Sequence, residues 1–197
     1  MRLPSTAHTS RPWRIHELAP DFTLEDVWAL PTPGDQGELP RLIEAIFGGD
    51  FPKGAPLVVR LLWDARWKLG ALFGWDDEKD GFGARVSPLR ERLGSAPQAK
   101  QSCTVTDLAP FSLVYQLDDE FAAEMANRTV HTVMHLGWVP DGSGGYRGQM
   151  AVLVKPNGRF GSLYLAGIAP FRRLLVYPAL LHRIQRQWDA AGVGATG

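Results

Sequence analysis

His131 and His135 are the residues whose type and spacing most readily suggest metal binding or proton transfer, because they lie four positions apart. The stretch around them has the composition of a β-strand, in which side chains four positions apart point the same way but are separated by about 13 Å. Two histidines at that separation cannot share one metal ion unaided. The stretch also lacks the glutamate of the helical zinc motif with this spacing. We therefore predict no metal site.

The register of this strand decides whether its histidines are buried. The alternate positions are more apolar and are expected to face the core: Val130, Thr132, Met134, Leu136 and Trp138. His131 and His135 are then expected to face solvent or a polar rim. The opposite register would place both histidines inside a cavity, as hydrogen-bonding or acid–base groups.

Four carboxylates cluster near a turn just before this strand, at Asp118, Asp119, Glu120 and Glu124. Paired carboxylates perform acid–base chemistry when they are buried and perturb each other. Acidic residues at a hairpin are more often solvated, which is the interpretation we favour here. Arg128 has the same strand parity as Glu124, so an ion pair between them is expected. The alternative is that Arg128 anchors a ligand carboxylate.

Other chemical motifs are missing from the sequence. Cys103 is the single cysteine and lacks the surroundings of a nucleophile. No serine lies in a nucleophile elbow. The glycines between Asp141 and Gly145 join two expected strands, so they indicate a hairpin loop and not a phosphate-binding loop. The sequence identifies no cofactor and no catalytic residue.

Composition limits the class of protein. The 197 residues are 45% hydrophobic and 21% charged, as in an ordinary globular fold, and are expected to form one domain over 1–197. Lys+Arg and Asp+Glu are equal at 21 each, so no net field attracts nucleic acid. The apolar stretches are too short to span a membrane, and the first residues lack a signal peptide. A cytoplasmic location is expected, and the oligomeric state stays open.

The N-terminal half is expected to be largely helical. Its expected elements are a strand at Arg11–Leu18, a short helix at Asp21–Trp28 that ends at Pro31–Gly34, a helix at Glu38–Phe47, a longer helix at Pro56–Phe73, and a loop-rich excursion over 76–108 with one helical turn near Pro88–Leu93. Trp63 and Trp67 flank the apolar stripe of the longer helix. They favour a helix packed on two sides, with a lip at a cavity mouth or a peripheral membrane contact as the alternative.

The C-terminal half changes to strands and then returns to helix. The expected elements are strands at Phe111–Leu117, Phe121–Thr129, Val130–Val139 and Gln149–Lys155, followed by helical sequence over Phe160–Trp188, which Pro170 and Pro178 must begin, kink or interrupt. The stretch from Pro170 to Trp188 is expected to pack Phe171, Leu174, Leu175 and Leu181 on an antiparallel sheet. Segregated helices and strands indicate the α+β class.

This order of elements resembles a known family and fold. The stretches that carry the resemblance are PDFTLEDVWALPTP, LLWDARWKLGALFGWDD, DDEFAAEMANRTVHTVMHLGWVPDG, YRGQMAVLVKPNG and LYLAGIAPFRRLLVYPALL. They resemble the bacterial domain of unknown function 2867, within the START and Bet v 1-like (polyketide cyclase-like) superfamily. The resemblance implies a helix-grip fold, a curved antiparallel sheet wrapped around a long C-terminal helix, with extra helices in the N-terminal half. It implies no particular chemistry.

A gap between sheet and helix in such a fold suits a small hydrophobic ligand, such as a lipid or a polyketide-like compound. The residues expected to bind it are Tyr115, Met125, Arg128, Met134, Leu136, Trp138, Met150, Val152, Phe171, Leu175 and Tyr177. One alternative is a cyclase- or hydrolase-like enzyme in which His131, His135 or Glu124 moves a proton in the same cavity. Another is an interaction module that acts with a separately encoded oxidoreductase, because similar domains occur fused to dehydrogenase-like modules.

Overall fold

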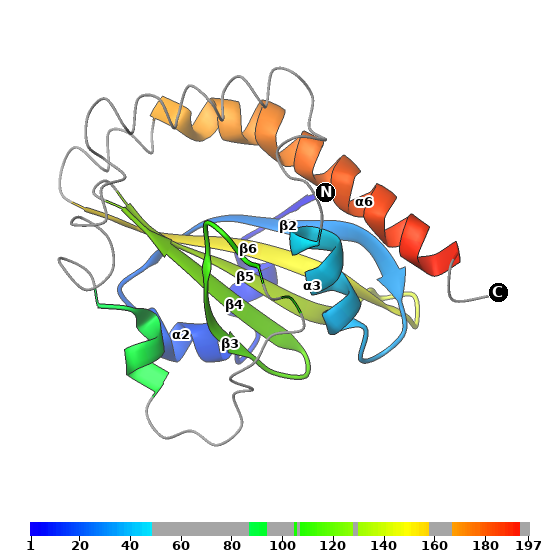
Figure 1. Ribbon diagram of the computed structural model, residues 1–197, viewed down its shortest axis with the longest axis horizontal. Helices are drawn as coiled ribbons and strands as arrows, with labels where there is room; N and C mark the ends of the chain where they lie inside the picture. The colour runs from blue at the N-terminus through cyan, green and yellow to red at the C-terminus, as the bar shows by residue number, and fades with distance from the viewer. Residues whose placement is uncertain (49–86, 94–104, 106, 128–129, 158–166, 194–197) are drawn as a thin grey trace.

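The computed structural model describes residues 1–48, 87–93, 105, 107–127, 130–157 and 167–193 (Figure 1). The strands are β1 (Arg2–Leu3), β2 (Thr23–Gly34), β3 (Ser112–Gln116), β4 (Glu120–Ala126), β5 (Val130–Pro140) and β6 (Tyr146–Pro156). They form one six-stranded antiparallel sheet in the order β1-β2-β6-β5-β4-β3. The α+β class and the antiparallel sheet are therefore confirmed.

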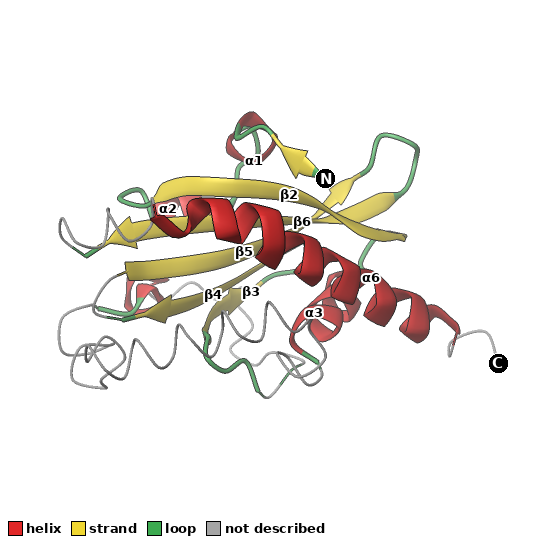
Figure 2. Ribbon diagram, turned by 90° about the horizontal axis from the view of Figure 1, so that it is seen from above, coloured by secondary structure: helices red, strands yellow, loops and turns green. Residues whose placement is uncertain are grey.

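Helical elements cover both faces of the sheet. We call the face under α3 (Leu39–Phe47) and α6 (Tyr177–Val193) the inner face, and Figure 2 shows α6 lying across it. The other face, which we call the outer face, carries α1 (Thr6–Thr9), α2 (Arg14–Leu18) and the 3-10 helix η2 (Leu89–Leu93). In Figure 1, α2 and α6 lie on opposite sides of the strands. Because both faces are covered, β4, β5 and β6 each bury side chains on both sides of the sheet.

The register assigns alternate residues of β5 to the two faces. Leu136 pairs with Met150 and Phe121, and all three belong to the inner core. His135 pairs with Ala151 and Ala122, and these alanines belong to the outer core. The expectation that the alternate set containing Leu136 faces the core is thus confirmed. The expectation that the histidines face solvent is wrong, because the outer face is also packed.

Of three expected N-terminal elements, one is confirmed and two are wrong. The helix at Glu38–Phe47 is confirmed as α3, with Gly48 directly after its last residue. The strand expected at Arg11–Leu18 is wrong, because Arg14–Leu18 is the short helix α2. The helix expected at Asp21–Trp28 is also wrong, because this stretch lies in β2, which continues through Pro31–Gly34.

Proline in β2 is tolerated because of where it lies in the sheet. β1 pairs only with Val27 and Trp28, so the later part of β2 has hydrogen-bonded strand on one side only among the described residues. The pairing with β6 is irregular between Ala29 and Pro33. Edge positions and irregularities are where strands accept proline, which cannot donate to a ladder.

The C-terminal helical run is confirmed over 167–193, with a π-helical stretch, η3, at Arg172–Val176. Pro178 follows this stretch directly. A proline ring clashes with the carbonyl group four residues earlier, here that of Leu174, and a wider turn relieves such a clash. The expected helical turn near Pro88–Leu93 is present as η2. The helix expected at Pro56–Phe73 lies outside the described residues, as does most of 76–108.

Two glycines let the layers approach the sheet. A Cβ atom on Gly148 of β6 would lie 2.8 Å from Leu42 Cδ2 of α3, so the helix rests against the strand backbone. A Cβ atom on Gly137 of β5 would lie 2.7 Å from the Trp13 ring on the outer face. Gly148 pairs with Trp138, the residue next to Gly137, so the two close approaches occur at the same level of the sheet.

Candidate functional site

One half of the inner face is completely packed. It comprises Phe121, Leu136, Trp138 and Met150, all buried under α3 and the C-terminal part of α6, and we call it the closed half. The Trp138 ring lies 5.5 Å from that of Trp188, and its indole donates a hydrogen bond to the carbonyl oxygen of Asp35 at 2.8 Å. A ligand has no room here without displacing the core.

The other half of the inner face is only partly covered. It comprises the partly exposed Met125, Thr132 and Met134 and the buried Val152 and Asp26, and we call it the open half. Met125, Thr132 and Met134 are partly exposed although they belong to β4 and β5 and point to the same side as the core. Inward-facing side chains of interior strands are ordinarily buried. Their exposure shows that the helical elements among the described residues do not seal this half of the sheet.

Asp26 is a buried carboxylate on the open half. Its side chain is fully buried, and residues 172–177 of the helical run lie over it. Arg172 contacts Asp26 Oδ2 through Nη2 at 2.9 Å, and Arg173 contacts Oδ1 through Nε at 3.2 Å. Arg2 lies 3.4 Å from Oδ1, and the Tyr177 hydroxyl donates to Oδ2 at 3.4 Å. A buried carboxylate requires such partners to offset its lost hydration.

The environment of Asp26 contains further polar groups. Arg172 also binds Glu25 Oε2 at 3.0 Å. Burial raises the pKa of Tyr177, so its hydroxyl stays protonated and remains a donor at neutral pH. The Trp28 ring packs 4.9 Å from the Tyr177 ring. In the part of the chain that the structure describes, Arg172 Nε and Trp28 Nε1 are buried donors with no hydrogen-bond partner.

A hydrogen-bonded chain of titratable groups crosses the outer face. His8 Nε2 lies 3.1 Å from His135 Nδ1, and His135 Nε2 lies 3.1 Å from Glu120 Oε2. The backbone N–H of Arg14 donates to both oxygens of Glu120, at 3.0 and 3.2 Å. The His16 ring lies 4.8 Å from that of His8. We call His8, His135 and Glu120 the histidine relay.

Burial controls the protonation of the histidine relay. Burial and, to a smaller extent, the neighbouring histidines lower the pKa of His8 and of His135 to about 3, with Asp119 acting in the opposite direction on His135. Burial raises the pKa of Glu120 to about 7, against the effect of the Arg14 hydrogen bonds. Both histidines are therefore neutral at neutral pH. The proton on Glu120 then sets which nitrogen of His135 is the donor, and hence the tautomer of His8.

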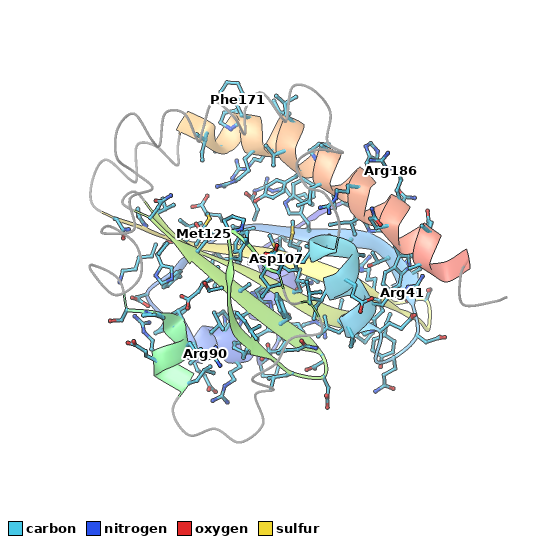
Figure 3. All side chains as sticks on the ribbon, viewed as in Figure 1. Arg41, Arg90, Asp107, Met125, Phe171 and Arg186 are labelled. Atoms are coloured by element: carbon cyan, nitrogen blue, oxygen red, sulfur yellow. The ribbon has the colours of Figure 1, made fainter. Side chains whose placement is uncertain are left out.

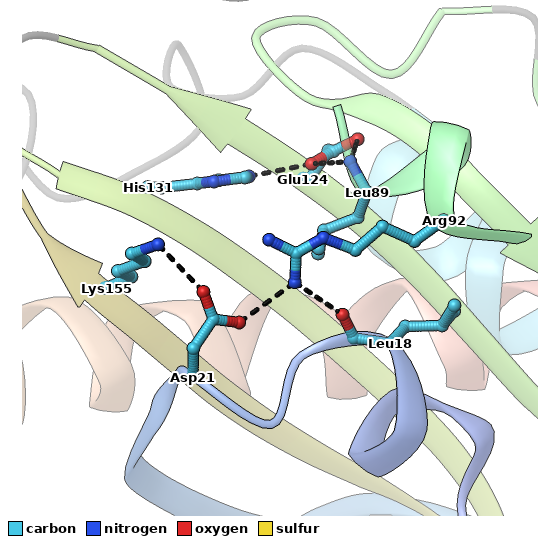
Figure 4. Close-up of polar contacts among 7 residues, drawn as sticks. All are labelled: Leu18, Asp21, Leu89, Arg92, Glu124, His131 and Lys155. Carbon is cyan, nitrogen blue, oxygen red and sulfur yellow. Dashed lines mark hydrogen bonds and ion pairs between the residues drawn. The ribbon is translucent and has the colours of Figure 1, made fainter. Parts of the chain in front are cut away.

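A second outer-face network joins η2 to the sheet (Figure 4). Glu124 accepts two hydrogen bonds from the backbone N–H of Leu89, each at 3.0 Å, and lies 2.7 Å from His131 Nε2. The expected pairing of Glu124 with Arg128 is not tested, because Arg128 lies outside the described residues. At the rim of this face, Asp21 binds Arg92 at 2.9 Å and Lys155 at 2.8 Å, and the Arg92 hydrogen bond holds the pKa of Asp21 well below its usual range.

The carboxylate cluster therefore divides between two environments. Asp118 and Asp119 are exposed, as expected. Glu120 and Glu124 are buried on the outer face, so the expectation of a solvated cluster is wrong for these two. A strand that alternates directs every second residue to the same face, and the outer face is packed rather than wet.

The expected ligand-binding residues also fall in different places. Met125, Met134, Val152 and Tyr177 border the open half, whereas Leu136, Trp138 and Met150 belong to the closed half. Tyr115 lies in the core of the outer face, on the other side of the sheet from the rest. Its pairing with Ala122 through a register irregularity in β3 explains that placement.

Three positions of the C-terminal helical run differ from expectation. Phe171 is 54% exposed, Leu174 74% and Leu175 37%, so the expectation that they pack against the sheet is wrong. Figure 3 shows Phe171 on the side of the helical run that points away from the sheet. Leu181 packs against the inner core, as expected. The wider π-helical turn at Arg172–Val176 changes which residues face inward, and Tyr177, Leu180 and Ile184 make the other contacts.

Asp26, Arg172 and Arg173 were not among the residues expected to bind a ligand. Asp26 was assigned to a helix, where a carboxylate near the first turn needs no partner. In a strand, the same residue alternates with Trp28 and Leu30, and that apolar alternation is the signal for an inward-facing carboxylate. His8 carried no signal, because it lies in a four-residue helix that no periodicity identifies.

Metal and membrane sites have little support in the described parts of the chain. No group of three or more His, Cys, Asp or Glu side chains there is arranged to hold a metal ion. None of the helices described is both long enough and apolar enough to cross a membrane.

Comparison with known proteins gives one match. The model of a family described as Protein of unknown function (DUF2867) matches residues 18–179. The matched region contains the sheet from β2 onward and extends to the Tyr177–Asp26 contact. No curated protein and no solved structure matches the chain. Because the matched region covers most of its length, the chain belongs to the DUF2867 family.

Proposed function

We propose that this protein binds one small, mostly apolar molecule on the open half, between β4, β5, β6 and the helical run over residues 167–177. The observation that supports this is the partial exposure of Met125, Thr132 and Met134 on an inner face whose other half is fully buried. In this proposal the sheet and C-terminal helix form a helix-grip arrangement, similar to that of the START and Bet v 1-like superfamily.

The chemistry of the open half suits an apolar ligand. Met134 and Val152 provide aliphatic surface, and methionine adapts its shape to different partners. Burial of apolar surface contributes roughly 25 cal/mol per Å² before the cost of ordering the ligand is subtracted. Affinity is therefore expected to come mainly from the apolar part of the ligand, with polar groups near Asp26 orienting one end.

An enzyme that uses the same site is a weaker alternative. The groups considered for proton transfer, His131, His135 and Glu124, lie on the outer face, so the sheet separates them from the open half. All three side chains are buried and hydrogen-bonded. His131 and Glu124 are bonded to each other, His135 is bonded to Glu120, and Glu124 also accepts from the Leu89 backbone. General acid–base catalysis requires direct or single-water reach to the reacting atom.

Titration with N-phenyl-1-naphthylamine, a neutral dye whose fluorescence rises in apolar surroundings, tests the proposal. We expect about one bound dye per chain and its displacement by dodecanol. Thr132→Phe places a larger side chain on the open half and is expected to weaken dye binding at least tenfold. Ser112→Phe is the matched control, because Ser112 is exposed on the edge strand β3. It should leave dye binding unchanged.

The same titration can contradict the proposal. Absence of dye binding to the folded wild-type protein would exclude an accessible apolar site. Equal dye binding by wild type, Thr132→Phe and Ser112→Phe would place the dye elsewhere on the molecule. Circular dichroism of each variant establishes that a loss of binding is not a loss of fold.

A further inference from the structure

The arginines over the open half exceed the carboxylates that they contact. Asp26 is surrounded by Arg2, Arg172 and Arg173, and Glu25 adds one further carboxylate through Arg172. Among the described residues, these three guanidinium groups and two carboxylates leave an excess of one positive charge at neutral pH. Arginine does not lose its proton in proteins, so this excess persists across the physiological range.

Hydrogen-bond donors are also in excess at this place. Arg172 Nε and Trp28 Nε1 are buried and unpartnered among the described residues, and neither can accept a hydrogen bond. Trp28 is about nine-tenths buried, and it follows Asp26 on the same face of β2. A buried donor without an acceptor is costly, so these atoms indicate an acceptor that the protein itself does not supply.

We propose that the ligand of the open half is an aliphatic or aromatic monocarboxylic acid, whose carboxylate is bound by Arg172 and Arg173 while its apolar part lies against Met134 and Val152. This inference rests on the proposed function and adds the chemical class of the ligand. One ligand charge would neutralise the excess positive charge. An amine would be repelled, and a neutral alcohol would leave the charge unbalanced.

The two arginines have different parts in this proposal. The Arg172 side chain is only 14% exposed and is held by Glu25 and Asp26, so its position is fixed before a ligand binds. The Arg173 side chain is 39% exposed and contacts Asp26 through Nε alone, which leaves its two terminal nitrogens for a ligand. Both lie in the π-helical stretch, and such stretches are frequent at functional sites.

Competition between a matched acid and alcohol tests the class of ligand. The competitors are dodecanoate below its micelle concentration and dodecanol below its solubility limit, both at pH 8, and each is expected to displace N-phenyl-1-naphthylamine from the wild-type protein. We expect dodecanoate to bind at least tenfold more tightly than dodecanol, and the preference to fall as salt is raised. Displacement by both compounds with equal affinity would overturn the acid proposal while supporting the apolar site.

Substitutions of opposite effect sharpen this test. Arg173→Gln removes a ligand-binding charge and is expected to reduce the preference for dodecanoate about tenfold, with dodecanol unaffected. Glu25→Gln removes a carboxylate that competes for Arg172 and is expected to increase the preference. Arg186→Gln is the matched control, because Arg186 is exposed and points away from the sheet in Figure 3.

Each outcome then separates the two proposals. Failure of the dye and both twelve-carbon compounds to bind would overturn the proposed function. Binding of both compounds with a preference that none of these substitutions changes would overturn the carboxylate assignment only. Loss of dodecanol binding in Arg173→Gln would also contradict it, because the arginine would then support the fold of the site and not the recognition of charge.

Discussion

The two faces of the sheet bury polar groups in different ways. On the inner face, Asp26 is surrounded by permanently charged arginines that lie at an accessible half of the sheet. On the outer face, the histidine relay is closed off from solvent and its groups are mostly neutral at neutral pH. Permanent charge next to accessible apolar surface suits ligand recognition. Neutral, enclosed histidines suit docking of α1 onto the sheet.

The two faces are also expected to respond differently to a change of pH. The charge balance around Asp26 involves guanidinium groups that do not titrate below strongly alkaline pH. The histidine relay contains three groups whose protonation changes between about pH 3 and pH 7. Acid is therefore expected to act first on the outer face.

The largest expected effect is the loss of stability when a buried leucine of the inner face is truncated, compared with truncation of an exposed leucine in the helical run above it. Leu136→Ala removes a fully buried side chain of the closed half and is expected to lower the free energy of unfolding by about 2–5 kcal/mol. Leu175→Ala changes a 37% exposed side chain and is expected to cost less than about 1 kcal/mol. Urea unfolding of both variants measures the difference. Equal losses would mean that Leu175 is packed as tightly as Leu136.

The second effect is the pH dependence of stability that the outer face produces. Burial lowers the pKa of His8 and His135 from 6.5 to about 3, so their contribution to stability is present above pH 6.5 and is lost as the pH falls. Burial raises the pKa of Glu120 from 4.5 to about 7, so its contribution is present below pH 4.5 and is lost as the pH rises. Between pH 4.5 and 6.5 the unfolded chain then binds a net excess of one proton.

That net proton corresponds to a fall in stability of roughly 1 kcal/mol for each pH unit of acidification. His8→Gln is expected to flatten the dependence between pH 4.5 and 6.5, and Glu120→Gln to make it about twice as steep. Urea unfolding at half-unit pH steps measures these slopes. His182→Gln changes an exposed histidine on α6 and serves as the control. Identical slopes for wild type and the His8 and Glu120 variants would refute the assigned protonation states.

The smallest effect concerns the rim of the outer face. Lys155 and Asp21 form an ion pair at 2.8 Å whose side chains are 45% and 37% exposed. Lys155→Gln is therefore expected to lower the free energy of unfolding by no more than about 1 kcal/mol, and the difference should vanish in high salt. A salt-independent loss would show that Lys155 contributes through packing of its aliphatic chain instead.

Much of the C-terminal half could be predicted from the sequence, because its strands alternate and its hairpin contains glycine. The hairpin at Asp141–Gly145 places positive φ angles at Gly142 and Gly144, as such turns require. The N-terminal half could not be predicted in the same way. Asp21–Trp28 has capping residues that favour a helix, but pairing with β6 along most of its length overrides that local preference.

The burial of the outer face was not predicted from the sequence, for a different reason. The alternation of β5 was interpreted correctly, but the prediction assumed one packed face and one solvated face. The continuous apolar run from Met150 to Val154 was the signal against that assumption, because strands buried on both sides lose their polar alternation. The Asp26 site needed information that no local pattern contains, since its partners in the helical run lie 146 to 151 positions away in the sequence.

Gly137 and Gly148 have a consequence for the thickness of the molecule. Each of two neighbouring strands omits one side chain, one on the outer side and one on the inner side, at the same level of the sheet. The three layers are therefore locked at one level, where Trp13 and Leu42 rest on backbone. A slip of β5 against β6 by one residue would exchange the sides and push both layers outward at once. The close layer spacing is therefore possible only in the observed strand register, because only that register places each glycine under the side chain that rests on it.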